Sequence, residues 1–85
     1  MEIIFSLKAL KQFEYWKTSG NKKVFNKIRT LLDEVRHTPF EDSGKPEQLK
    51  YEFAGYWSRR ITDEHRLVYK VENDVVLIIQ LRYHY

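Results

Sequence analysis

The spacing of apolar residues changes at Pro39, and this change constrains the fold more than any other feature of the sequence. Before Pro39 the apolar side chains recur at helical intervals, and after it they alternate as in β-strands. The helix just before Pro39 must end near His37, because a proline disfavours the helical conformation of the residue that precedes it. Its apolar stripe is the clearest in the chain and consists of Val24, Ile28, Leu31, Leu32 and Val35.

A first strand and a shorter helix are predicted ahead of this stripe. Glu2–Ser6 carries a short apolar run, and Ser6 can cap a helix that Gly20 ends. Asn21 can then cap the second helix. The apolar positions of the first helix are Leu7, Leu10, Phe13 and Trp16.

The rest of the chain is typical of an antiparallel meander joined by short turns. Residues 38–48 hold two prolines, a glycine and several polar side chains, so a loop is expected there. Two helices followed by such a sheet predict a single α+β domain over residues 1–85, with both helices on one face of a mainly antiparallel sheet. The place of the first strand in this sheet stays open. The predicted meander strands are Leu49–Phe53, Tyr56–Thr62, Arg66–Glu72 and Val75–Tyr83.

The composition excludes several classes of protein. The 85 residues include no cysteine, so the core must come from aliphatic side chains and from five Phe, six Tyr and two Trp, without disulfides or thiolate metal sites. The longest apolar run, Val75–Ile79, is far shorter than the roughly 20 residues that span a bilayer. The N-terminus lacks the order of a signal peptide. We therefore expect a cytoplasmic protein that does not enter a membrane.

Strand alternation divides the predicted sheet into two faces. The apolar set belongs under the helices and includes Tyr51, Trp57, Tyr69, Val75, Leu77, Ile79 and Leu81. The opposite set gathers a carboxylate and several cations, namely Glu52, Lys50, Arg60, Arg66, Arg82 and His84. Arg59 breaks the pattern on the apolar side and is expected to snorkel to an edge. Such a cationic face suits a polyanion, but an ordinary solvated sheet face explains it equally well.

The residues allow RNA cleavage without a metal. That reaction needs a base for the 2′-OH, an acid for the leaving 5′-oxygen and cations for the phosphorane charge. Alternation favours Glu52 as the base, whereas Glu47 lies in the predicted loop, so the residues alone leave the base open. Among the histidines, His37 at a helix end and His65 in a turn have adequate structural explanations, and His84 on the cationic face is the candidate acid.

Several segments carry a resemblance to a known family. These are Thr38–Glu41, Gly44–Lys50, Gly55–Thr62, Glu64–Tyr69 and the terminal Arg82–Tyr85. Together they closely resemble the YoeB toxins of the RelE-like superfamily, and the resemblance covers nearly the whole chain. It implies a small α+β fold similar to microbial ribonucleases. It also implies a bacterial toxin that cleaves mRNA in the A site of the 30S subunit, with neither metal nor cofactor.

The resemblance also implies roles for individual residues and partners. It assigns the general base to Glu47 rather than Glu52, and it assigns stabilisation of the transition-state phosphate to Arg66. His84 corresponds to the general acid, and Tyr85 to the terminal residue that helps to place the substrate. Supporting phosphate contacts fall on Lys50 and Arg60. The implied partners are ribosome-bound mRNA, a YefM-like antitoxin, DNA only through the antitoxin complex, and a second toxin copy.

Two other classes of function remain open at this stage. The first is a non-catalytic module, such as a degenerate toxin, that binds RNA or the ribosome. The second is a toxin of the same fold that poisons DNA gyrase. The set Glu47, Arg66 and His84 argues against the first, and the Arg82–Tyr85 ending disfavours the second.

Overall fold

A computed structural model describes residues 1–41 and 46–83 of the chain. It has the predicted α+β architecture, with two helices and a five-stranded sheet. In chain order the elements are β1 (Glu2–Phe5), α1 (Leu7–Thr18), α2 (Lys22–His37), β2 (Glu47–Gln48), the 3-10 helix η1 (Tyr51–Phe53), β3 (Trp57–Arg60), β4 (Arg66–Glu72) and β5 (Val75–Gln80).

Both helices begin and end as the sequence predicts. The Ser6 hydroxyl accepts a hydrogen bond from the Ala9 amide at 3.1 Å, and the Asn21 side chain accepts one from the Val24 amide at 3.1 Å. Each side chain therefore satisfies an amide that the first helical turn leaves unpaired. The predicted stripe of α2 is buried, and the helix ends at His37.

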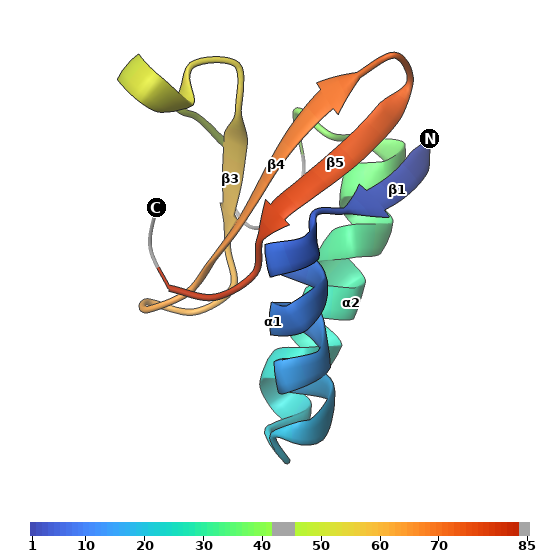
Figure 1. The fold of residues 1–85 in the computed structure, drawn as a ribbon, viewed down its shortest axis with the longest axis vertical. Helices are drawn as coiled ribbons and strands as arrows, with labels where there is room; N and C mark the ends of the chain where they lie inside the picture. The colour runs from blue at the N-terminus through green and yellow to red at the C-terminus, as the bar shows by residue number, and fades with distance from the viewer. Residues whose placement is uncertain (42–45, 84–85) are drawn as a thin grey trace.

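The strands have the order β1-β5-β4-β3-β2. β1 pairs with β5 in parallel, and every other neighbouring pair is antiparallel. This answers the question of the first strand, which lies beside the last. Figure 1 shows α1 and α2 lying together on one side of the molecule, with β3 and the η1 turn on the other. Residues of both helices pack with β4 and β5 into one core.

The predicted alternation is correct in β4 and wrong in most of β5. Leu67 and Tyr69 face the helices as expected. In β5, however, Val76 and Ile78 are the fully buried core residues, and Leu77 lies on the opposite face beside Lys70 of β4. All residues from Val75 to Ile79 are apolar, so polarity could not mark the inner set.

A bulge explains why Leu81 nevertheless reaches the core as predicted. The register between β4 and β5 changes from Tyr69↔Ile78 to Val68↔Gln80, which leaves Ile79 as the extra residue. A single extra residue reverses the alternation of all that follow. Leu81 is consequently buried, and its carbonyl accepts a hydrogen bond of 2.8 Å from the Trp16 indole.

The predicted strand Leu49–Phe53 does not form. The strand consists instead of Glu47–Gln48, inside the expected loop, and the chain then turns through η1. Tyr51 has φ +58°, and the Phe53 amide donates to the Lys50 carbonyl, so the backbone curls rather than extends. The predicted core position of Tyr51 is wrong, because its side chain is 92% exposed. The other meander strands are as predicted or shorter, with β3 ending at Arg60 and β5 at Gln80.

Arg59 lies inside the molecule rather than at an edge. Its side chain is fully buried, and one terminal nitrogen donates to the carbonyls of Thr38 and Glu41, both at 2.5 Å. The other terminal nitrogen lies 3.4 Å from the carboxylate of Glu34 on α2. The prediction that this side chain snorkels to an edge was wrong, because distant parts of the chain supply hydrogen-bond acceptors for the guanidinium in the interior. We call this group of contacts the Arg59 latch.

Tyr69 completes the latch from β4. Its hydroxyl donates to the Pro39 carbonyl and accepts a hydrogen bond of 3.2 Å from the Arg59 Nε. Burial raises the pKa of Tyr69 above the ordinary 10.0, although the neighbouring Arg59 opposes this shift. The latch therefore holds residues 38–41 against β3 and β4.

Loss of the Arg59 guanidinium should destabilise the fold strongly. Arg59→Leu removes the buried donor that bonds two loop carbonyls, the Glu34 carboxylate and the Tyr69 hydroxyl, so we expect a loss of about 3–5 kcal/mol in the free energy of unfolding. The matched control is Arg60→Leu, because the neighbouring Arg60 side chain is exposed and a surface change costs about 0.5 kcal/mol or less. Urea denaturation followed by circular dichroism measures both. Equal losses for the two variants would contradict the latch.

Tyr69 should make the fold sensitive to alkali. The native state holds the phenol proton more tightly than the unfolded state, so this stabilisation is fully present below the unfolded pKa near 10.0 and is lost as pH rises through the native pKa. Urea midpoints measured between pH 8 and pH 11 should fall more steeply for the parent than for Tyr69→Phe. At neutral pH that variant should be less stable by about 1–2 kcal/mol, because the Pro39 carbonyl loses its donor. Identical alkaline slopes would show that Tyr69 does not contribute.

Candidate active site

Three neighbouring strands bring the predicted site residues to one face of the sheet. In the register, Glu47 of β2 lies opposite Ser58 of β3, and Ser58 lies opposite Val68 of β4. Arg60 and Arg66 form a second cross-strand pair, two residues further along. Residues opposite one another point to the same side of a sheet. All five therefore share the face turned away from the helices, which we call the outer face.

The arginine pair is the most charged feature of the outer face. Side chains directly opposite in an antiparallel pair have Cβ atoms about 4.5–5.5 Å apart, so two like charges there repel each other. An exposed contact of 3.6 Å between Arg60 and Asp63 offsets part of this repulsion. The Nε of Arg66 is buried, and no hydrogen-bond acceptor reaches it within residues 1–41 and 46–83. An anion bound between the two arginines would offset this repulsion.

The carboxylate and the lysine predicted for the site line one hollow. Glu47 and Lys50 are both exposed, and with Tyr51 and Phe53 they border a hollow of about 340 Å³ next to η1. Glu52 lies in η1 itself rather than in a strand. The alternation that favoured Glu52 over Glu47 as the base therefore no longer applies.

Ser58 is a residue of the outer face to which sequence reasoning gave no role. Its hydroxyl is fully buried, and it has no hydrogen-bond partner in the described part of the chain. A buried hydroxyl without a partner is costly in a native structure. The sequence signal for Ser58 was its alternation with the inward residues Trp57 and Arg59. That alternation predicted the face on which Ser58 lies, but it indicated no chemical role.

The end of the described chain is anchored beside Arg66. The Arg66 amide donates to the Tyr83 carbonyl at 3.0 Å, and the Tyr83 amide donates to Nδ1 of His65 at 2.8 Å. This second bond assigns the proton of a neutral His65 ring to Nε2. The ring also packs edge-on against Trp16 at 4.8 Å between centroids. His65 thus has a structural role, as the sequence indicated, and it fixes the backbone just before His84.

The other terminal residues differ in how far the structure places them. Arg82 was predicted on the cationic face, and its guanidinium stacks 3.6 Å from the Tyr15 ring of α1 and 4.7 Å from the Tyr83 ring. The stacking ties Arg82 to α1. His84 and Tyr85 lie outside the described residues. His37 sits exposed at the end of α2, with Nδ1 2.9 Å from the Asp33 carbonyl.

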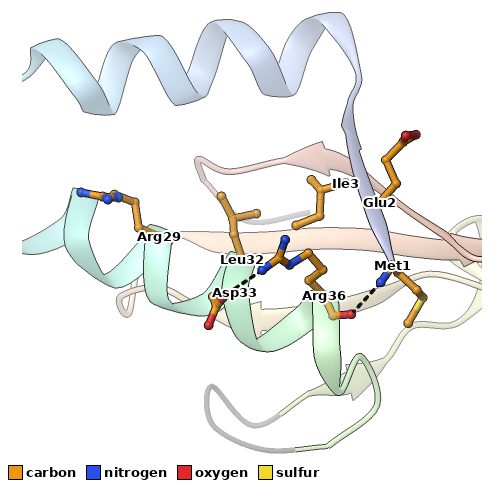
Figure 2. Close-up of a pocket in the computed structure, with 7 residues that line it drawn as sticks. All are labelled: Met1, Glu2, Ile3, Arg29, Leu32, Asp33 and Arg36. Atoms are coloured by element: carbon orange, nitrogen blue, oxygen red, sulfur yellow. Dashed lines mark hydrogen bonds and ion pairs between the residues drawn. The ribbon is translucent and has the colours of Figure 1, made fainter.

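A second groove lies between β1 and α2, away from the predicted site residues. Figure 2 shows its lining, in which Arg36 faces Asp33 and the terminal amine of Met1. Arg36 and Asp33 form an exposed ion pair of 3.2 Å, and the Met1 amine donates to the Arg36 carbonyl at 3.4 Å. The groove also includes Glu2, Ile3, Arg29 and Leu32. None of the predicted site residues lines it.

Residues 1–41 and 46–83 contain neither a metal-type cluster nor a helix of membrane-spanning character. Over residues 1–41 and 46–83, no three acidic or histidine side chains come together as a metal site would require. In the same ranges, no helix combines the length and hydropathy needed to cross a bilayer.

Comparisons with known proteins agree on one family. The family described as YoeB-like toxins of bacterial type II toxin-antitoxin systems matches residues 5–85. Toxin YoeB of Escherichia coli K12 is 48% identical over the full length of both chains. The structure of a YoeB/ParE toxin from Agrobacterium tumefaciens superposes with a TM-score of 0.94, at 41% identity and full coverage of both chains. A YoeB–YefM complex from Staphylococcus aureus superposes with a TM-score of 0.88, at 42% identity and covering 100% of this chain and 98% of the other. A structure of a YoeB dimer from the same species superposes with a TM-score of 0.87, at 42% identity.

Proposed function

The chain belongs to the YoeB family of toxins from bacterial type II toxin-antitoxin systems, and from this premise we propose that it is a ribosome-dependent mRNA endoribonuclease. The observation that carries the proposal is the Arg60–Arg66 pair, which shares the outer face with Glu47. A phosphodiester placed there meets two cations and a carboxylate. We treat residues 1–85 as one catalytic domain.

The proposed reaction is attack by the 2′-hydroxyl on the neighbouring phosphorus. Glu47 takes the 2′-OH proton, the 2′-oxygen bonds to phosphorus, and the bond from phosphorus to the 5′-oxygen breaks. His84 donates a proton to that departing oxygen. The products are a 2′,3′-cyclic phosphate and a 5′-hydroxyl end, and every atom is supplied by the RNA and the two side chains.

The cations serve the charge that develops during this step. Arg66 is half-buried on the outer face, and its guanidinium can stabilise the negative charge that develops on the phosphate oxygens. Arg60, directly opposite Arg66, and Lys50, which borders the hollow next to η1, add positive charge, and Tyr85 helps to place the substrate. The reaction as written needs neither a metal ion nor a cofactor.

Dependence on the ribosome follows from the openness of the site. Glu47, Lys50 and Arg60 are exposed, so the outer face holds flexible RNA weakly. Correct placement of reacting groups can supply roughly 7–11 kcal/mol of a barrier. We propose that the 30S A site supplies this placement by holding the mRNA codon, and that free RNA is a poor substrate.

The proposed partners follow from the same surface. A disordered acidic segment of a YefM-like antitoxin would fold over the cationic outer face and cover Arg66, with an affinity that falls as salt rises. The Staphylococcus aureus complex supports such a partner, and the dimer of that toxin supports self-association of this one. DNA would be bound only through the antitoxin complex. All of these partners belong to the cytoplasm.

The two carboxylates that compete as base give a direct test. Glu47→Gln should reduce cleavage of mRNA on translating ribosomes by about 10²- to 10⁴-fold, because the 2′-OH loses its proton acceptor. Glu52→Gln is the matched control, and it should cleave like the parent. Primer extension on the mRNA measures the rates, and circular dichroism confirms folding. Loss of activity in the Glu52 variant alone would return the role of base to that residue.

Removal of His84 and Tyr85 should separate activity from folding. The apolar core of the described chain lies before these residues, so the fold should lose about 1–2 kcal/mol while cleavage falls by about 10²- to 10⁴-fold. His84→Gln should match the truncation in activity and melt nearly like the parent, and His37→Gln is the active control.

A folded truncation that cleaves at the parental rate would place the acid elsewhere, with His65 the next candidate. A truncation that fails to fold would instead make the terminus structural.

A further inference from the structure

Tyr51 is the most exposed of the large apolar side chains in the described residues. Its side chain is 92% exposed, against 70% for the next, Leu7. It belongs to η1, the turn that joins β2 to β3 and projects at the edge of the molecule in Figure 1. No hydrogen bond, ion pair or ring contact holds its side chain within residues 1–41 and 46–83. Packing therefore does not explain a tyrosine here.

The backbone of Tyr51 is also unfavourable for a bulky residue. Its φ of +58° lies in the left-handed region, where a side chain crowds its own carbonyl and where Asn, Asp and Gly are the usual residues. Asn73 and Asp74 occupy the same region in the β4–β5 turn and are of that usual kind. Tyr83, at φ +66°, is the other described aromatic residue in this region, but its ring contacts His65 and Arg82. Tyr51 is both strained and exposed, which indicates a use outside the fold.

The surroundings of Tyr51 identify that use. The residue lines the same hollow as Glu47 and Lys50, the proposed base and a proposed phosphate contact. Proteins that bind single-stranded RNA combine cations for the backbone with exposed aromatic rings for the bases. Here a cation, a carboxylate and an exposed aromatic ring meet around one hollow.

We propose that Tyr51 is the platform on which a nucleobase flanking the cleaved bond stacks. The inference rests on the proposed nuclease function and deepens it. Stacking holds the base against η1 while Lys50 contacts the phosphate, and the ribose is then presented to Glu47. Tyr51 is a substrate-positioning residue, and its hydroxyl is not needed.

Three substitutions at Tyr51 separate stacking from other effects. Tyr51→Ala should lower the single-turnover efficiency of mRNA cleavage on programmed 70S ribosomes by about 5- to 150-fold, the usual effect of losing one base stack. Tyr51→Phe should cleave like the parent. Tyr51→Asn should lose activity like the alanine variant while its melting temperature stays equal or rises, because asparagine tolerates the left-handed backbone. Leu7→Ala, which removes another exposed apolar side chain, is the control with parental activity.

An mRNA with a single abasic nucleotide tests the contact itself. Each position of the A-site codon is made abasic in turn, and cleavage by the parent and by Tyr51→Ala is compared. At one position the abasic change should slow the parent by about 5- to 150-fold and add little to the alanine variant, because the same stack is already lost.

The outcomes distinguish the two proposals. A parent that cleaves no ribosome-bound mRNA overturns the nuclease function and this inference with it. A parent that cleaves, with losses that multiply at every abasic position, overturns the platform alone. In that case an effect of Tyr51→Ala would belong to a contact with the ribosome rather than with a nucleobase. Parental cleavage by Tyr51→Ala would also overturn the platform and leave the nuclease function standing.

Discussion

The buried guanidinium of Arg59 ties three parts of this molecule together. It bonds the loop carbonyls of Thr38 and Glu41, the Glu34 carboxylate of α2 and the Tyr69 hydroxyl of β4. Because strand alternation turns each residue to the side opposite its neighbour, holding Arg59 inside turns Ser58 and Arg60 to the outer face. Two adjacent arginines thus have opposite roles, one in the core of the fold and one in the proposed site.

Local signals were enough to predict the helices, while distant contacts decided most of what sequence reasoning missed. Ser6 and Asn21 cap the helices through atoms only three residues away, so their pattern is visible in the sequence. The parallel pairing of β1 with β5 joins the two ends of the chain and leaves no local trace. The inward-facing residues of β5 could not be predicted because both faces of that strand are apolar. The left-handed turn at Tyr51 could not be predicted because no glycine or asparagine occupies that position.

In the candidate site, too, some features could be predicted from local sequence and others could not. Alternation alone placed Arg60 and Arg66 on one face, and their register confirms it. It also pointed to Glu52, because it assumed a strand where η1 forms, whereas the family resemblance pointed to Glu47 on β2. His84 and Tyr85 follow a backbone that His65 and Arg66 hold through Tyr83. The proposed acid, His84, therefore directly follows a residue whose backbone is bonded to Arg66, the proposed phosphate ligand. His84 itself lies outside the described residues.

The central claim is that the outer face promotes attack by the 2′-hydroxyl of the RNA. An mRNA with one 2′-deoxynucleotide immediately before the cleaved bond tests this most directly, because the substitution removes only the attacking oxygen. On programmed ribosomes the parent toxin should leave that bond intact while cutting the all-ribose mRNA to give a 5′-hydroxyl end. Cleavage of the deoxy-substituted bond, or a 5′-phosphate end on the product, would show that water is the nucleophile and would contradict the mechanism.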